Sequence, residues 1–128
     1  MAALGNPSGS GYVAGSLLCA DATGYVIPLI NGNGKLGANF LRITTTTAAV
    51  MIQVSKRAQP GDAAPSAVTA SPACASAGDT STWIKLAAGR EFTIGLQTSL
   101  QTDDSQADRF TDLQVWALGA ALVDYYGH

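Results

Sequence analysis

The sequence predicts an all-β protein, an antiparallel β-sandwich of the jelly-roll or immunoglobulin-like kind with about seven or eight strands. First, apolar side chains alternate with polar ones along several short stretches, which is the period of a half-buried strand. Second, these stretches are rich in threonine, valine and isoleucine, whose branched β-carbons fit a pleated sheet and crowd a helix. Third, glycine, proline and asparagine separate the stretches, as expected for turns.

The chain has 128 residues, which predicts one domain with one hydrophobic core. We expect residues 1–24 to form an extended glycine-rich N-terminal arm and residues 25–128 to form the sandwich. Glycines and Pro7 interrupt any regular element in the arm. A frayed terminus is the alternative, but several apolar side chains favour an arm that orders against a neighbour. They are Leu4, Tyr12, Val13, Leu17 and Leu18.

The first strand of the predicted sandwich covers residues 25–30. Pro28 lies within it and has no amide hydrogen to donate, which predicts an edge strand or a bulge. The sequence Asn-Gly-Asn-Gly follows at 31–34 and predicts a tight turn. A phosphate-binding loop would need a helix after it, and we expect another strand there instead.

Two further strands are predicted at 40–47 and 50–55, with residues 47–49 as a turn or a bulge between them. Leu41 and Ile43 share one face of the first, and Val50, Ile52 and Val54 share one face of the second. Residues 56–80 are rich in proline, alanine and serine, which predicts a long loop, either functional or loosely ordered, with one possible short strand at 67–71. In a virion subunit it would be a contact loop.

Residues 79–98 show the clearest pattern and predict a β-hairpin around a tight turn at 87–90. Residues 99–112 follow as a solvated acidic loop that contains four aspartates, and a weak Ca²⁺ site is its alternative. The four are Asp103, Asp104, Asp108 and Asp112. The last strand is predicted at 113–118, and the aromatic C-terminus beyond it should complete a sheet or pack on a partner.

Reactive chemistry is scarce in this chain. Its single histidine is His128, the final residue, and a terminal, mobile imidazole is a poor general base because catalysis requires fixed geometry. Cys19 and Cys74 lie too far apart for a zinc signature, and we expect free thiols, with a bridge within or between subunits as the alternative. We therefore expect no catalytic residue, no cofactor and no metal site.

Charged residues make up 12% of the chain, against about 25% in an average soluble domain. The net charge is −2 and the basic residues are scattered, which argues against nucleic-acid binding. No apolar run reaches the roughly 18 residues of a membrane span, and no basic leader precedes an apolar segment. We expect neither a signal peptide nor a transmembrane segment, and assembly in the cytoplasm of the host cell.

A surface so poor in charge tends to associate with other surfaces, which predicts a subunit that works by contact, in a homo-oligomer or a larger assembly. The two tryptophans fall opposite the main apolar faces of their strands, where they cover an interface or offer a platform to a sugar ring. The candidate interface residues are Leu4, Tyr12, Val13, Leu17, Leu18, Trp83, Trp116, Tyr125 and Tyr126.

The run Thr82-Trp83-Ile84-Lys85-Leu86, followed by Ala88-Gly89 and Glu91-Phe92-Thr93-Ile94, resembles the closing hairpin of small β-sandwich proteins in the virions of tailed bacteriophages. The resemblance is to capsid decoration, or cement, proteins. It implies a non-enzymatic subunit, trimeric or of higher order, that binds the major capsid protein and stabilises the phage head. Another virion component (tail, head–tail junction or fibre) and a carbohydrate-binding module remain as alternatives. The long loop at 56–80 departs from the pattern.

Overall fold

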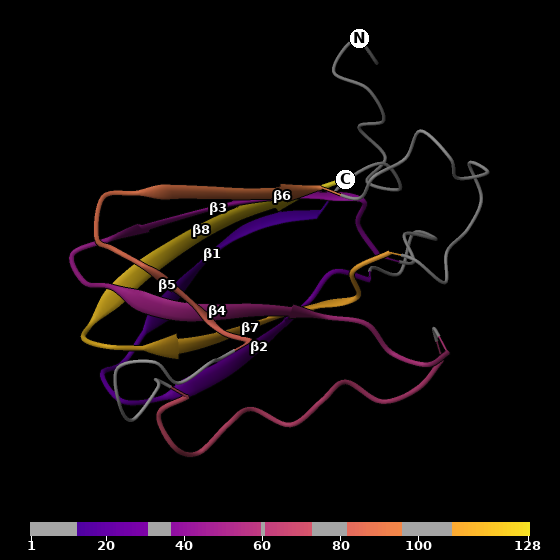
Figure 1. The fold of residues 1–128 in the computed structure, drawn as a ribbon, viewed down its shortest axis with the longest axis horizontal. Coiled ribbons are helices and arrows are strands. Elements are labelled where there is room, and N and C mark those ends of the chain that lie inside the picture. The colour runs from indigo at the N-terminus through magenta and orange to yellow at the C-terminus, as the bar shows by residue number, and fades with distance from the viewer. Residues whose placement is uncertain (1–12, 31–36, 60, 73–81, 96–108) are drawn as a thin grey trace, which may run out of the picture.

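The computed structural model describes residues 13–30, 37–59, 61–72, 82–95 and 109–128. These residues form eight strands and no helix, in two antiparallel sheets of four strands each (Figure 1). Sheet A has the order β1-β8-β3-β6, with bounds Val13–Cys19, Ala121–Gly127, Phe40–Thr46 and Glu91–Gly95. Sheet B has the order β2-β7-β4-β5, with bounds Gly24–Pro28, Asp112–Ala117, Val50–Ser55 and Ile84–Leu86. The predicted all-β sandwich is confirmed.

The strand pairing selects the jelly roll from the two predicted kinds of sandwich. β1 pairs with β8, β2 with β7, β3 with β6, and β4 with β5, so the chain pairs as one long nested hairpin. That hairpin is wrapped into two sheets by the further pairs β3·β8 and β4·β7. Eight strands arranged in two sheets with this order are a jelly roll.

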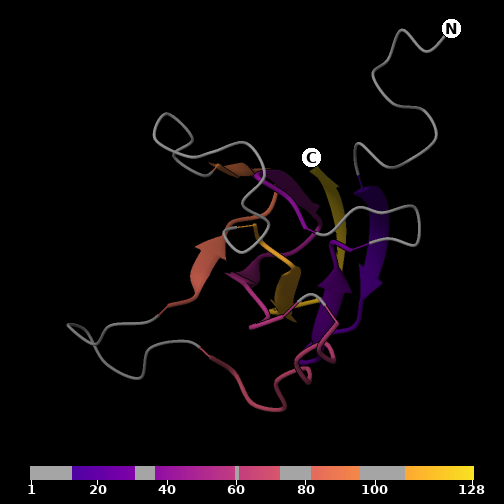
Figure 2. The ribbon, with the colours of Figure 1, turned by 90° about the vertical axis from the view of Figure 1, so that its right-hand side faces the viewer.

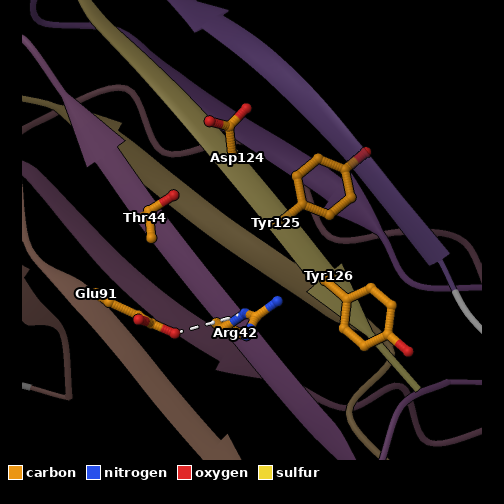
Figure 3. Close-up of a pocket in the computed structure, with 6 residues that line it drawn as sticks. All are labelled: Arg42, Thr44, Glu91, Asp124, Tyr125 and Tyr126. Carbon is orange, nitrogen blue, oxygen red and sulfur yellow. Dashed lines mark ion pairs between the residues drawn. The ribbon is translucent and has the colours of Figure 1, made fainter.

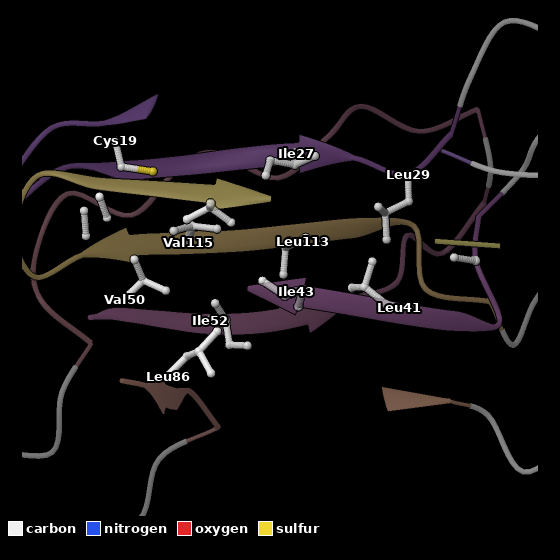
Figure 4. Close-up of a cluster of buried hydrophobic side chains, with 14 residues drawn as sticks. Cys19, Ile27, Leu29, Leu41, Ile43, Val50, Ile52, Leu86, Leu113 and Val115 are labelled. Carbon is white, nitrogen blue, oxygen red and sulfur yellow. The ribbon is translucent and has the colours of Figure 1, made fainter. Parts of the chain in front are cut away.

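The core lies between the two sheets (Figure 4). The alternation predicted for 40–47 and 50–55 is confirmed, since Leu41, Ile43, Val50 and Ile52 are buried in the core and Val54 packs partly buried against it. Leu113 and Val115 of β7 complete the middle of the core. Each fully buried side chain of this size stabilises the fold by about 1.5–3 kcal/mol.

The predicted hairpin at 79–98 is wrong. β5 and β6 do not pair with each other, because β5 pairs with β4 in sheet B and β6 pairs with β3 in sheet A. The turn between them instead carries the chain from one sheet to the other. The amide of Arg90 donates to the carbonyl of Ala87 over 3.1 Å, and the amide of Gly89 donates to Thr45 of β3 over 2.8 Å. The alternation of apolar and polar residues predicts which face of a strand points inward, but it does not predict which strand lies next to it in the sheet.

Residues 13–19 form an edge strand of sheet A, where the sequence predicted an arm. The register β1·β8 runs without interruption from Val13 opposite Gly127 to Cys19 opposite Ala121. Glycine at position 15 leaves room for the Tyr125 ring, whose hydroxyl oxygen would lie 2.6 Å from a β-carbon there. The expected arm thus contributes a strand from Val13 onward, and its residues 1–12 lie outside the described part.

Of the remaining predictions about single segments, some are confirmed, one is wrong and one lies outside the described residues. Pro28 ends β2, an edge strand as expected, and residues 47–49 form the connection between sheets. The segment 67–71 forms no strand. The turn predicted at 31–34 lies outside the described residues.

The C-terminus is anchored, so the expectation of a mobile His128 is wrong. Its amide and carbonyl both bond the backbone of Phe40, over 2.9 Å each. The carbonyl also accepts the amide of Asn39 over 2.7 Å. β8, which leads to it, lies in the middle of sheet A. The aromatic C-terminal segment therefore completes a sheet, one of its two predicted roles.

Candidate functional site

The outer side of sheet B is covered by the protein's own chain. Figures 1 and 2 both show residues 56–59 and 61–72 running along that side, below the sheet in Figure 1. All six residues of β7 are buried, although alternate residues point out of the sandwich. A β-carbon at Gly24 of β2 would collide with the carbonyl oxygen of Val68 in this loop. Residues 56–72 are called the cover loop from here on.

One ion pair fastens the start of the cover loop to β7. The Arg57 guanidinium donates from Nε to Asp112 Oδ2 over 2.9 Å and from Nη2 to Asp112 Oδ1 over 2.8 Å. The Asp112 side chain is 0% exposed and that of Arg57 is 12% exposed. The hydrogen bond to Asp112 is the main cause that raises the pKa of Arg57 above its ordinary value. The two-point geometry fixes orientation as well as charge.

The same pair organises its surroundings. Thr111 donates its hydroxyl to Asp112 over 2.8 Å and accepts the Arg57 amide over 2.9 Å. Arg57 also donates from Nη1 to the carbonyl of Asp62 over 2.8 Å, which closes the first turn of the loop. Asp112 was predicted to belong to a solvated acidic loop, and that prediction is wrong, because Asp112 begins β7 and is buried.

A depression of about 210 Å³ lies beside this pair, between the end of β4 and the cover loop. Ser55 contributes a buried hydroxyl to which the structure gives no hydrogen-bond partner. The charged groups of Arg57 and Asp112 are already engaged with each other. We therefore interpret the depression as a structural junction between β4 and the cover loop.

Sheet A presents the opposite situation, because its outer side carries no comparable cover among the described residues (Figure 2). Register places Ser16, Asp124, Thr44 and Glu91 in one row across the sheet. The neighbouring row contains Ala14, Tyr126, Arg42 and Thr93. We call this outer side, with Leu18, Phe40, Thr46 and Leu122 added, the sheet A face.

Aromatic and charged groups meet at the C-terminal end of the sheet A face. The rings of Phe40 and His128 lie 5.2 Å apart, and those of Tyr126 and His128 lie 5.6 Å apart. The Arg42 guanidinium lies 5.9 Å from the centre of the Tyr126 ring and 3.5 Å from the Glu91 carboxylate. The Arg42 and Glu91 side chains are 55% and 49% exposed, so this ion pair contributes less than about 1 kcal/mol to stability.

A depression of about 270 Å³ lies on this face (Figure 3). Its lining comprises Arg42, Thr44, Glu91, Asp124, Tyr125 and Tyr126. Asp124 accepts a hydrogen bond from Ser16 of the edge strand. Figure 3 shows Tyr125 leaning toward β1 while Tyr126 projects beside Arg42. The depression offers a cation, two carboxylates, a hydroxyl and a ring on rigid strands, which suits noncovalent binding.

The predicted interface residues do not converge on one surface. Leu18 is 78% exposed on the sheet A face, and Tyr126 lies half-buried on the same face, opposite Ala14. Leu17 and Tyr125 pack against the core. Trp116 is 7% exposed, on the side of β7 that the cover loop encloses. The other predicted residues are Val13 and Trp83, both half-buried, and Leu4 and Tyr12, which lie outside the described residues.

Sequence reasoning missed Arg42, Asp124 and Arg57. Arg42 and Asp124 come from different strands and meet only through the pairing of β3 with β8. Arg57 and Asp112 are separated by 55 residues. The one available signal was a charged residue inside an alternating strand, which holds for Arg42 and for Asp124 alike.

Metal and thiol chemistry finds little support in the described ranges. No group of three metal-ligating side chains occurs within them. Cys19 is a free and buried thiol, and burial raises its pKa. Cys74 and the aspartates at 103, 104 and 108 lie outside the described residues, as does any calcium site they would form. The part of the chain that the structure describes contains no helix long and apolar enough to cross a membrane.

Comparisons with protein-family models, with curated proteins and with solved structures found no match for this chain. The jelly-roll fold and the exposed sheet A face are therefore the basis on which a function can be proposed.

Proposed function

We propose that this protein is a non-enzymatic virion structural protein, a capsid decoration protein that binds the major capsid protein through its sheet A face and bridges neighbouring subunits. One observation carries the proposal. Sheet B is closed off by the cover loop, whereas the sheet A face is exposed and holds Leu18, Tyr126 and Arg42. The resemblance of the 82–94 run to decoration proteins is one of sequence only, because β5 and β6 do not form the closing hairpin on which it rests.

The composition of the sheet A face favours protein docking. Its charged members at the described positions are Arg42, Glu91 and Asp124, and no lysine is among them. Tyrosine and arginine are the residues most enriched in the centres of protein interfaces, and lysine is depleted there. Because these side chains stand on paired strands, docking would order little backbone, which lowers the entropic cost of association.

Fold-level analogy points in the same direction. Jelly rolls occur in viral capsid proteins and in lectins, so the fold is compatible with the proposal and does not by itself select it.

The test is binding of the purified protein to heads of the phage that encodes it. We expect saturable binding to intact heads, and the Arg42→Ala, Tyr126→Ala double variant should weaken it at least tenfold, as for a central interface pair. Lys85→Ala is the matched control, because Lys85 is exposed on β5, which belongs to sheet B. Binding that is absent, or unchanged in the double variant, would contradict the proposal.

Copy number separates decoration from the other virion positions. A decoration protein should occur in purified virions at a number comparable to that of the major capsid protein or its capsomers. A tail, fibre or head–tail junction protein should occur in far fewer copies. Quantitative mass spectrometry of purified particles measures the ratio.

A second candidate is carbohydrate binding, and a specific observation favours it. The depression on the sheet A face combines the Tyr126 ring with Arg42 and two carboxylates, a set that can stack on a sugar and bond its hydroxyls. The sugar platform predicted at Trp116 is wrong, because that ring is only 7% exposed. A glycan array with and without EDTA tests this candidate, with Tyr126→Ala as the variant expected to lose the signal.

A further inference from the structure

The two sheets have four edge strands, and three of them show devices that block pairing with another chain. β2 has five residues, ends in Pro28 and has Val68 of the cover loop against Gly24. β5 has only three residues and includes an exposed Lys85. β6 has five residues and begins with the charged Glu91. Short strands, proline and charge are the usual means by which sheet edges avoid association.

β1 has none of these devices. It is seven residues long, contains no charged residue and no proline, and its uninterrupted register with β8 leaves no bulge. Among the strands that the structure describes, it pairs with β8 on one side only. Its Leu18 is 78% exposed, the most exposed of the large hydrophobic side chains in the described part of the chain. A long, flat, uncharged edge of this kind is a template for another strand.

We propose that β1 pairs with β1 of a second copy of this chain, which joins the two A sheets into one sheet of eight strands, four from each copy. The occupant is a second copy because the edge is self-complementary. Two copies of an uncharged strand meet without like-charge repulsion, and small side chains at Ala14, Gly15 and Ser16 allow close approach.

Symmetry restricts the register of this pair. In an antiparallel pair of identical strands, opposite residues must share both the sheet face and the direction of their amide groups. The twofold axis must therefore lie midway between the two copies of one residue, so that this residue faces its own copy. If the axis is centred on Ser16, all seven residues of the strand are paired, and Ser16 lies opposite Ser16 of the second copy. Leu18 then lies opposite Ala14 of the second copy, which covers part of its exposed side chain.

This dimer is independent of capsid binding and differs from the trimer that the resemblance implies. A twofold edge pair closes on itself, because each copy uses the same strand. The enlarged sheet A face would then present two copies of Tyr126 and Arg42 on the same side.

Cysteine cross-linking tests the register in the full chain. In a Cys74→Ser background, Ser16→Cys should form a disulfide-linked dimer on mild oxidation, since directly opposed residues lie about 4.5–5.5 Å apart at Cα and disulfides span about 4.4–6.8 Å. Ala14→Cys is the matched control, because its two copies would lie four residues apart, about 13 Å. Equal cross-linking of the two variants, or none at position 16, would overturn the proposed pairing.

Sedimentation velocity tests the assembly without oxidation. The protein should sediment as a species of twice 13.0 kDa at micromolar concentration. Ser16→Lys places two ammonium groups opposite each other and should raise the dimer dissociation constant at least tenfold, while Thr93→Lys on β6 should leave it unchanged. Circular dichroism establishes that both variants are folded. A monomeric or trimeric wild-type protein would reject the proposal, as would a Ser16→Lys dimer of unchanged stability.

Discussion

Replacing Arg57 by alanine should destabilise the protein more than almost any other single change outside the core. The replacement leaves the Asp112 carboxylate, 0% exposed, without its two-point partner. Breaking a buried ion pair from one side costs about 3–5 kcal/mol. For 128 residues, the average entropy of unfolding converts that loss into a fall in Tm of about 10–20 °C.

Urea unfolding at pH 7 and fixed protein concentration measures the loss. Asp112→Asn should cost less, about 1–3 kcal/mol, because it removes the charge while keeping the shape and leaves Arg57 partly exposed to water. Arg90→Ala, at an exposed site, should stay within about 0.5 kcal/mol of the wild type. In a Trp83→Phe background, acrylamide should quench Trp116 more strongly once the cover loop is released. An Arg57→Ala protein that loses less than about 1 kcal/mol would refute the assignment of the ion pair as the fastening of the loop.

Three further predictions concern single positions. Gly24→Val should cost about 1–3 kcal/mol in urea unfolding because its side chain would meet Val68, whereas Gly61→Ala, in open space, should be neutral. Gly89→Ala should cost about 1–2 kcal/mol, since φ is +79° there, and an unchanged midpoint would contradict the turn geometry. Because burial raises the Cys19 pKa above 9.0, its stabilising contribution is present below that pH and declines as the pH rises above it. In a Cys74→Ser protein, the thiol should react slowly with Ellman's reagent at pH 8 until urea is added, and a fast native reaction would count against its burial.

Local pattern predicted much of this fold. Alternation located the strands around Leu41, Val50 and Leu113 and assigned their inward faces, because one buried face is a local requirement that the sequence must meet residue by residue. Pro28 marked an edge strand for an equally local reason, its missing amide hydrogen.

It was harder to predict which strands and side chains pair than to predict which face of each strand is buried. The 87–90 turn looks like a hairpin turn in sequence, yet in the structure it connects two sheets, and the choice is made by β3 and β4 rather than by the turn. β1 was obscured by Gly15, which breaks the expected pattern but accommodates the Tyr125 ring. Arg57 and Asp112 give no sequence signal as a pair, because their contact depends on the loop lying back on sheet B.

The cover loop links the stability of this protein to its proposed mode of action. A sandwich has two outer faces, and in a chain with 12% charged residues neither is protected by charge alone. Sheet B is protected by the cover loop, which lies against Gly24 through Val68 and is fastened by Arg57. Sheet A keeps its face and the β1 edge exposed. Under the proposed β1 pairing, association uses this side of the molecule alone, so releasing the cover loop should broaden self-association beyond the dimer. Sedimentation of Arg57→Ala should show species larger than twice the chain mass, and a sharp wild-type-like boundary would show that the loop does not limit association.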